Sequence, residues 1–153
     1  MKILLAIDGS NCSESAVETL IGHYNPTKTE VLVLHVVESP KLIPTSCDFG
    51  LSPMFVQDYS AIIEQWRKEG KELVSRTGER LRAAGFNTTA QLEEGYVKDA
   101  ILDWAKKWNA DLILIGSHGK RGLDRFLLGS VSEAVSRHAA CSVEIVRPMP
   151  AAA

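Results

Sequence analysis

The stretch 110-ADLILIGSHGKRGLDRFLLGS-130 contains the pattern that decides the fold. Leu112–Ile115 form a short apolar run rich in β-branched residues, which predicts a buried strand. Glycines and basic residues follow, and a stripe of apolar residues with helical spacing then continues from Leu127 to His138. The stretch therefore predicts a strand, a loop and a helix in that order.

The same alternation of strand and helix extends over the whole chain. Apolar stripes with helical spacing lie between further strand candidates, which are Lys2–Ile7, Glu30–Val37, Asn87–Leu92 and Ser142–Val146. Buried strands that alternate with helices indicate a parallel sheet covered by helices on both faces. We expect one doubly wound α/β domain with a five-stranded sheet at 1–148, followed by a disordered tail at 149–153.

Composition limits the classes of function. The chain has 153 residues, of which 45% are hydrophobic and 24% are charged, and its net charge of −2 gives no general attraction to nucleic acid or membrane. The apolar run Ile3–Ile7 is too short for a signal peptide, which needs about 7–15 apolar residues. We expect a cytoplasmic protein that binds neither nucleic acid nor membrane.

Three cysteines, Cys12, Cys47 and Cys141, are far apart and lack the spacing of metal ligands. Free thiols in a reducing compartment are the simpler interpretation, because an odd number of cysteines argues against a disulfide framework. Cys12 lies beside a candidate site loop, so it is the one cysteine that we consider as a redox-sensitive thiol.

The segment at 38–57 is too long for an ordinary connection, which has about 2–6 residues in folds of this kind. We expect Pro40, Pro44 and Pro53 to prevent a continuous helix there. A long loop after a strand lies at the edge of the sheet where ligands bind. It is therefore either a lid or partner surface, or a mobile insertion, and the residues do not distinguish the two.

Two loops are equipped for ligand binding. The first is 8-DGSNCSES-15, which follows the first strand, and the second follows the fourth strand at 116–130. Ligands of parallel α/β sheets bind at the carboxyl ends of the strands, where neighbouring connections diverge to opposite faces. If the first and fourth strands are neighbours, both loops face one crevice.

The second loop has the components of a phosphate site. Gly116 and Gly119 remove two Cβ atoms, which permits unusual φ angles and lets backbone N–H groups approach an anion closely. Ser130, followed three residues later by Glu133, matches a capping box, which predicts a helix start whose N–H groups favour phosphate. Lys120, Arg121 and Arg125 add positive charge.

Two common nucleotide motifs are absent from the sequence. Gly119-Lys120 lacks the Ser or Thr of a Walker A loop, and the spacing G-x-x-G-x-x-G differs from the dinucleotide fingerprint. The residues alone leave open a nucleotide or phosphate site, or an ordinary glycine-rich surface turn.

Gly116, Gly119, Gly129 and Ser130 together spell G-x-x-G, nine residues, then G-S. This spacing resembles the ATP-binding motif of the universal stress protein family, and the chain looks like the branch that keeps these glycines. The likeness extends to 5-LAIDGS-10, 34-LHVVE-38, 110-ADLILIGSHG-119 and 142-SVEIVRP-148, and it is weakest at 39–57. It implies a sheet with strand order 3-2-1-4-5, similar to the adenine-nucleotide alpha-hydrolase fold.

The resemblance also implies the residues of the site. Ala6 and Asp8 would lie at the adenosine, with Asp8 near the ribose, and Val36 would contact adenine through its backbone. The phosphates would be bound by two groups of residues. The first, which also reaches the ribose, is Gly116, Ser117, His118, Gly119, Lys120, Arg121 and Gly122; the second, which donates N–H groups, is Gly129, Ser130 and Val131. Mg²⁺ or Mn²⁺ would be held mainly by phosphate oxygens and water. The family also implies a homodimer that pairs through the last strand at 142–147.

Candidates for catalysis are few. Asp8 could orient water or metal, and Arg121 or Arg125 could stabilise charge, while His118 is either a general base or, more simply, a structural or phosphate-contacting histidine. The missing Walker-type residues argue against rapid turnover. We expect an ATP-binding stress or regulatory switch with at most slow hydrolysis. The alternatives are a weak ATPase or adenine-nucleotide hydrolase, and an interaction module that binds another small ligand or no nucleotide.

Overall fold

Five parallel strands form one sheet in the computed structural model, which describes residues 1–38, 53–119 and 128–148, with side chains described in α2 only from residue 60. The strands are β1 (Lys2–Ala6), β2 (Glu30–Glu38), β3 (Asn87–Gly95), β4 (Leu112–Gly116) and β5 (Ser142–Val146), and their order is β3-β2-β1-β4-β5. At the centre, Leu4 of β1 pairs with Leu32 of β2 and with Ile113 of β4. The predicted fold class and strand order are confirmed.

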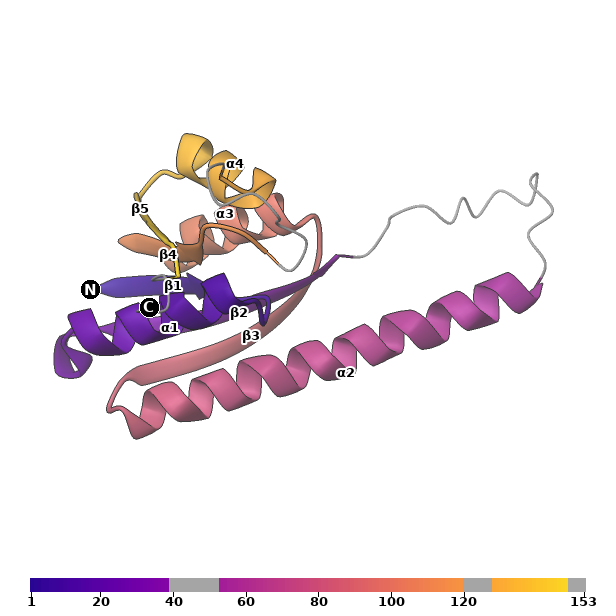
Figure 1. The fold of residues 1–153 in the computed structure, drawn as a ribbon, viewed down its shortest axis with the longest axis horizontal. Coiled ribbons are helices and arrows are strands. Elements are labelled where there is room, and N and C mark those ends of the chain that lie inside the picture. Colours follow the sequence, from indigo (N-terminus) through magenta and orange to yellow (C-terminus); the bar gives the residue numbers. More distant parts are fainter. Residues whose placement is uncertain (39–52, 120–127, 149–153) are drawn as a thin grey trace, which may run out of the picture.

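Helices cover both faces of the sheet (Figure 1). They are α1 (Asn11–His23), α2 (Pro53–Ala83), α3 (Val97–Trp108) and α4 (Ser130–His138), with a short 3₁₀ turn at Pro26–Lys28. The helices α1 and α2 lie on one face, and α3 and α4 lie on the other. Among the described residues, no helix combines the length and apolarity that a bilayer-spanning segment requires.

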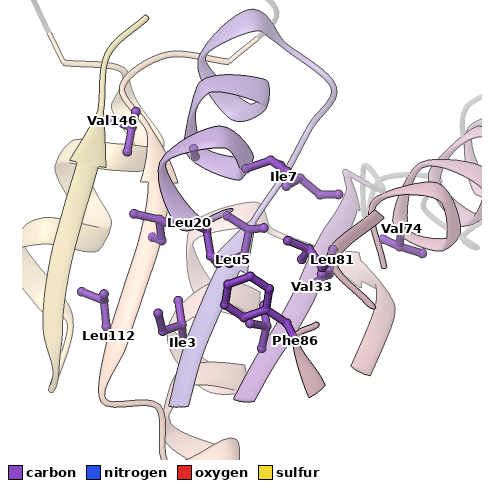
Figure 2. Packing of buried hydrophobic residues seen from close by; sticks show 14 residues of the cluster. Ile3, Leu5, Ile7, Leu20, Val33, Val74, Leu81, Phe86, Leu112 and Val146 are labelled. Atoms are coloured by element: carbon purple, nitrogen blue, oxygen red, sulfur yellow. The ribbon is translucent and has the colours of Figure 1, made fainter. Parts of the chain in front are cut away.

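Alternate residues of the central strands supply two apolar cores. Ile3 and Leu5 of β1 belong to the cluster under α1 and α2, whereas Leu4 and Ala6 belong to the cluster under α3 and α4. Ile3, Leu4 and Leu5 are fully buried, as expected for a strand that has helices on both sides. Figure 2 shows the first cluster, in which strand residues such as Leu5 lie beside Leu20 of α1 and Leu81 of α2.

Two element boundaries differ markedly from the prediction, whereas the ends of β1, β2 and β4 differ by one residue. The helix α2 begins at Pro53, inside the segment 38–57 that we interpreted as a long loop. Proline is favoured in the first turn of a helix, because its φ is already helical and its missing N–H has no partner to lose there. The strand β3 continues past Leu92 to Gly95, because β2 is equally long and Glu38 pairs with Gly95. The predicted roles of residues 39–52 and of the tail 149–153 lie outside the described residues.

Charged pairs join α2 to α1 and to the end of β3, in addition to its apolar packing on the sheet. Near its C-terminal end, Arg80 bonds Glu14 at 3.0 Å and also Glu18, both on α1. Near its middle, Arg67 makes a bidentate pair with Glu94 at the end of β3, with Nε–Oε1 2.5 Å and Nη2–Oε2 3.0 Å. The part of α2 before Arg67 therefore runs beyond the sheet, as Figure 1 shows.

Candidate functional site

A cavity of about 840 Å³ lies at the carboxyl edge of the sheet. Its walls come from the ends of β1, β2 and β4, from the segments that follow β1, β3 and β4, and from the first turns of α3 and α4. Because β1 and β4 are neighbours, the two loops proposed from the sequence meet there. This is the position where parallel α/β sheets bind ligands.

Most of the predicted site residues line this cavity: Ala6, Asp8, Val36, Gly116, His118, Gly119, Gly129, Ser130 and Val131. Ser117 is 1% exposed and is not part of the wall. The remaining predictions, Lys120, Arg121 and Gly122, lie outside the described residues, as does the proposed charge stabiliser Arg125.

Hydrogen bonds within the loop after β1 hold Asp8 in place. The N–H of Ser10 donates to Asp8 Oδ1 at 3.0 Å, and Ser13 Oγ accepts from the N–H of Gly9 at 3.2 Å. Ser10 is also the N-cap of α1, where its Oγ accepts from the N–H of Ser13 at 3.2 Å. Sequence reasoning missed Ser10 and Ser13, although a serine before an amphipathic stripe is a capping signal.

The glycines of the second loop are required by close contact between chain segments. A Cβ on Gly116 would lie 2.7 Å from the backbone carbon of Cys12, and one on Gly119 would lie 2.8 Å from Asp8 Oδ2. Neither of these two glycines uses the positive φ that the missing Cβ permits. In the loops that line the cavity, the described glycine with positive φ is Gly9, at 75°.

Side-chain bonds also join the two loops. Ser10 Oγ donates to the carbonyl of His118 at 3.3 Å, and Ser117 Oγ donates to Cys12 Sγ at 3.7 Å. His118 Nδ1 lies 3.2 Å from Ser117 Oγ. These contacts make the N-terminus of α1 and the end of β4 one packed unit.

The first turn of α4 forms the wall at the β4 end of the cavity, but its cap differs from the prediction. The helix begins at Ser130, where the pattern placed its start, but Gly129 is the N-cap and no side chain caps the helix, so the predicted capping box does not form. Glu133 instead pairs with Arg137 at 2.7 Å, because the cap position already lies one residue earlier. The N–H of Gly129 donates to Ser117 O at 2.8 Å. The N–H groups of Ser130 and Val131 have no acceptor inside the helix, because they belong to its first turn.

Apolar residues form the middle of the cavity. Leu34 and Val36 of β2, Ile101 of α3 and Ile115 of β4 line it and are 1–7% exposed. A flat apolar group, such as an aromatic ring, can bury its faces against this surface.

The opposite end of the cavity was missed from the sequence. It is formed by Glu38 at the end of β2 and by Tyr96, Val97 and Lys98 at the start of α3. The signal that could have revealed it is Gly95, which marks the end of a strand, directly before the apolar helical stripe that starts at Val97. We had instead expected the third strand to end at Leu92, which separated these residues from the site.

His35 has a packing role, as the sequence suggested. Its Nδ1 lies 2.7 Å from the carbonyl oxygen of Ile7, and its ring lies against α2, where a Cβ on Gly70 would come within 2.7 Å of Cδ2. Among the described residues, no three His, Cys, Asp or Glu side chains are grouped as metal ligands. Asp8 is the one carboxylate among the predicted site residues that line the cavity.

Comparisons with known proteins identify the family. The model of the universal stress protein family matches residues 1–147. A universal stress protein of Methanocaldococcus jannaschii is 30% identical over 146 residues, covering 95% of this chain and 81% of that protein. One from Bacillus subtilis is 32% identical over 146 residues, covering 95% and 98%.

Solved structures share the fold. A universal stress protein from Lactobacillus plantarum superposes with a TM-score of 0.77 at 22% identity, covering 96% of this chain and 97% of the other. One from Arabidopsis thaliana with AMP bound gives 0.68 at 21% identity, covering 96% and 91%. A universal stress protein in complex with cAMP gives 0.68 at 20% identity, covering 97% of both chains. The chain belongs to the universal stress protein family.

Proposed function

We propose that this universal stress protein binds an adenine nucleotide, ATP foremost, in the cavity at the carboxyl edge of its sheet. The observation that carries the proposal is that one cavity has helix N–H donors at one end and an apolar patch next to them. Free helix N–H groups of α4 lie at one end, and the apolar patch of Leu34, Val36 and Ile101 lies beyond them. Helix N-termini favour phosphate, and an apolar patch favours the faces of a base.

The phosphate end requires little rearrangement. Ser130 and Val131 supply two backbone donors, and the positive end of the α4 dipole adds to them. The N–H of Gly129 is already bonded to Ser117, so we do not assign it to the phosphates. Lys120, Arg121 and Gly122 would complete the phosphate contacts.

The backbone of Val36 suits the base. Pairing between β1 and β2 ends at Ala6 and Leu34, with one further bond from the N–H of Ile7 to Leu34 O at 2.9 Å. Backbone groups of alternate residues face the same side of a strand, so those of Val36 face the space beyond the end of β1. Ala6 would then contact the adenosine, and Asp8 would lie near the ribose.

The protein side chains placed at the site do not hold a metal ion by themselves, so a metal ion would bind mainly to the nucleotide. Asp8 has one oxygen engaged by Ser10, and a single carboxylate does not make a protein site for Mg²⁺. Mg²⁺ or Mn²⁺ would therefore be held mainly by phosphate oxygens and water, where it would neutralise phosphate charge.

Binding is better supported than turnover. His118 Nδ1 is directed to Ser117 Oγ, so the histidine has a structural contact that a free general base would lack. We therefore infer a nucleotide-dependent switch in a stress response with at most slow hydrolysis. A bound nucleotide would contact both the Asp8 loop and α4, and it would thereby stabilise their junction against opening.

Two proline substitutions, one at the start of α4 and one at the start of α1, test the site. Ser130→Pro removes one N–H at the first position of α4, where helices tolerate proline well. The residue before a proline must be extended, and Gly129 already is, with ψ 150°. We expect ATP affinity, measured by calorimetry on the purified chain, to fall about tenfold or more. Ser130→Ala, which keeps the N–H, should retain most of the affinity.

The matched control is Asn11→Pro at the first position of α1. Its N-cap Ser10 is equally extended, with ψ 163°, and Asn11 does not line the cavity. We expect little change in ATP affinity. An unchanged affinity in Ser130→Pro, with both variants folded, would contradict phosphate binding at α4.

We also propose that the chain forms a homodimer through β5. This strand lies at the edge of the sheet, and three of its five residues are only partly buried in the single chain. An unpaired edge of this kind is a template for pairing with another strand. Light scattering tests the proposal, and the mass of a single chain at micromolar concentration would contradict it.

A further inference from the structure

One peptide group in the loop after β1 is held at both of its ends. It joins Ile7 to Asp8, so its plane sets the direction in which the Asp8 side chain leaves the backbone. At one end, the carbonyl oxygen of Ile7 lies 2.7 Å from His35 Nδ1. At the other end, the N–H of Asp8 donates to Ser13 Oγ at 3.4 Å. The position of Asp8 at the cavity therefore depends on a side chain of β2 as well as on its own loop.

The bond from His35 is the closer of the two constraints. A backbone carbonyl only accepts hydrogen bonds, so Nδ1 of the ring carries the proton and donates it to Ile7 O. Ser13 Oγ, in contrast, is shared between the N–H groups of Asp8 and Gly9, at 3.4 and 3.2 Å. Ile7 is 5% exposed, and a buried carbonyl that loses its donor turns toward another one. Loss of the imidazole donor would therefore rotate the peptide and turn Asp8.

The other edge of the same ring lies directly under α2. Gly70 of α2 is buried there, and a Cβ on it would lie 2.7 Å from His35 Cδ2 and 2.8 Å from Leu92 Cδ1. The side chain of Ile7 belongs to the apolar cluster under α1 and α2, together with Val74 of α2 (Figure 2). Such close packing transmits displacement, so a movement of α2 at Gly70 would move the ring. The ring thus lies between α2 and the peptide group of the site loop.

We propose that His35 is a positioning residue of the nucleotide site and that it couples α2 to Asp8. The inference rests on the proposed nucleotide binding, in which Asp8 lies near the ribose. His35 acts on the nucleotide through the peptide between Ile7 and Asp8. Coupling between two sites is reciprocal: a shift of α2 at Gly70 changes nucleotide affinity, and a bound nucleotide favours one position of α2. The nucleotide-dependent switch thereby has a route from the cavity to a helix on the surface.

The donor and the bulk of His35 can be tested separately. His35→Asn keeps an N–H donor near the position of Nδ1 but is smaller, whereas His35→Leu keeps a bulky group under Gly70 but has no donor. We expect ATP affinity, measured by calorimetry, to fall about tenfold in His35→Leu and to stay within about threefold in His35→Asn. Urea denaturation should give the opposite order, with His35→Asn the less stable variant. ATP affinities that follow the order of stability would make His35 a packing residue only and would overturn the inference.

A double-mutant cycle tests whether the effect passes through Asp8. In the Asp8→Ala background, His35→Leu should cause no further loss of ATP affinity, because the side chain that His35 positions is gone. Losses that add in full would mean that His35 acts elsewhere, for example on the neighbouring Val36, and would contradict the coupling. Failure of the unchanged chain to bind ATP would overturn the proposed function together with this inference. ATP binding that His35→Leu leaves unchanged would overturn the inference alone.

The helix side of the coupling is tested at Gly70. Gly70→Ala places a methyl group against the ring, so we expect it to weaken ATP binding about threefold to tenfold, again only when Asp8 is present. Gly78→Ala is the matched control on the same helix, because its Cβ would meet the flexible end of Arg82 at 3.3 Å and Ala90 at 3.5 Å. That variant should keep its ATP affinity. An unchanged affinity in Gly70→Ala, with the variant folded, would overturn the coupling to α2.

Discussion

The junction of α1 with β4 and the contact of α2 with β3 use different means to attach a helix beside the same sheet edge. At the first, backbone meets backbone, because Gly116 leaves no room for a Cβ beside Cys12. At the second, Arg67 reaches from an exposed position to Glu94 at the end of β3. The first contact depends on shape, whereas the Arg67–Glu94 pair depends on charge in water and adds to the close packing of Gly70 against His35 and Leu92. Substitutions in the glycine junction and in the ion pair should therefore have very different effects.

The largest effect is expected at Gly116. An added Cβ would lie 2.7–2.9 Å from three atoms of Cys12 and Ser13, two of which are backbone atoms that cannot rotate away. We expect Gly116→Ala to lower the free energy of unfolding by about 2–3 kcal/mol, measured by urea denaturation. Gly22→Ala on α1 is the control, because nothing lies within 4 Å of its Cβ position. That variant should gain about 0.5–1 kcal/mol, and equal losses in both variants would erase the distinction between the two regions.

An intermediate effect is expected at Ser10. Its side chain caps α1 and donates to His118 O, so it belongs to the packed junction without filling its core. We expect Ser10→Ala to cost about 1 kcal/mol of stability in the same urea experiment. Ser15→Ala, whose hydroxyl bonds only within the exposed surface of α1, should change stability by less than about 0.5 kcal/mol. Similar values for the two serines would show that the cap contributes little.

The smallest effect is expected at the α2–β3 contact, and it should depend on pH. The hydrogen bonds from Arg67 hold the pKa of Glu94 below its ordinary value of 4.5. A lowered pKa in the folded state means that the pair stabilises the fold above that ordinary value and loses its contribution as pH falls through the folded pKa. Arg67→Met should therefore be less stable than the unchanged chain near pH 7, with the difference shrinking toward pH 3 and in high salt. Thermal unfolding across this range measures it, and a difference that is constant with pH would contradict the charge-based attachment.

Sequence patterns predicted the sheet better than its boundaries. The apolar runs of β1, β2, β4 and β5 are buried on both faces or lie directly beside the core, so composition alone reveals them. The end of β3 was missed because Glu93 and Glu94 are polar, and their strand conformation comes from pairing with Val36 and Val37 of β2. Such tertiary pairing is not visible in local composition.

The two loops singled out in the sequence line one cavity, but the reasons for their residues were only partly predicted. Gly116 and Gly119 are required by contacts with Cys12 and Asp8, which come from a distant part of the chain. Ser132 is a similar case, because its Oγ bonds Ser117 O at 2.9 Å and takes part in the turn that Ser130 was expected to cap. Only the folded chain brings these partners together.

The unequal strand lengths give the ligand surface a particular character. Strand β2 continues from His35 to Glu38 after its pairing with β1 has ended, so it extends roughly 13 Å beyond the end of β1 at about 3.3 Å per residue. Along this stretch the backbone groups of Val36 have no partner on β1, whichever side chains the strand carries. A ligand contact made by these backbone groups would therefore survive side-chain substitutions in β2 that would abolish a side-chain contact.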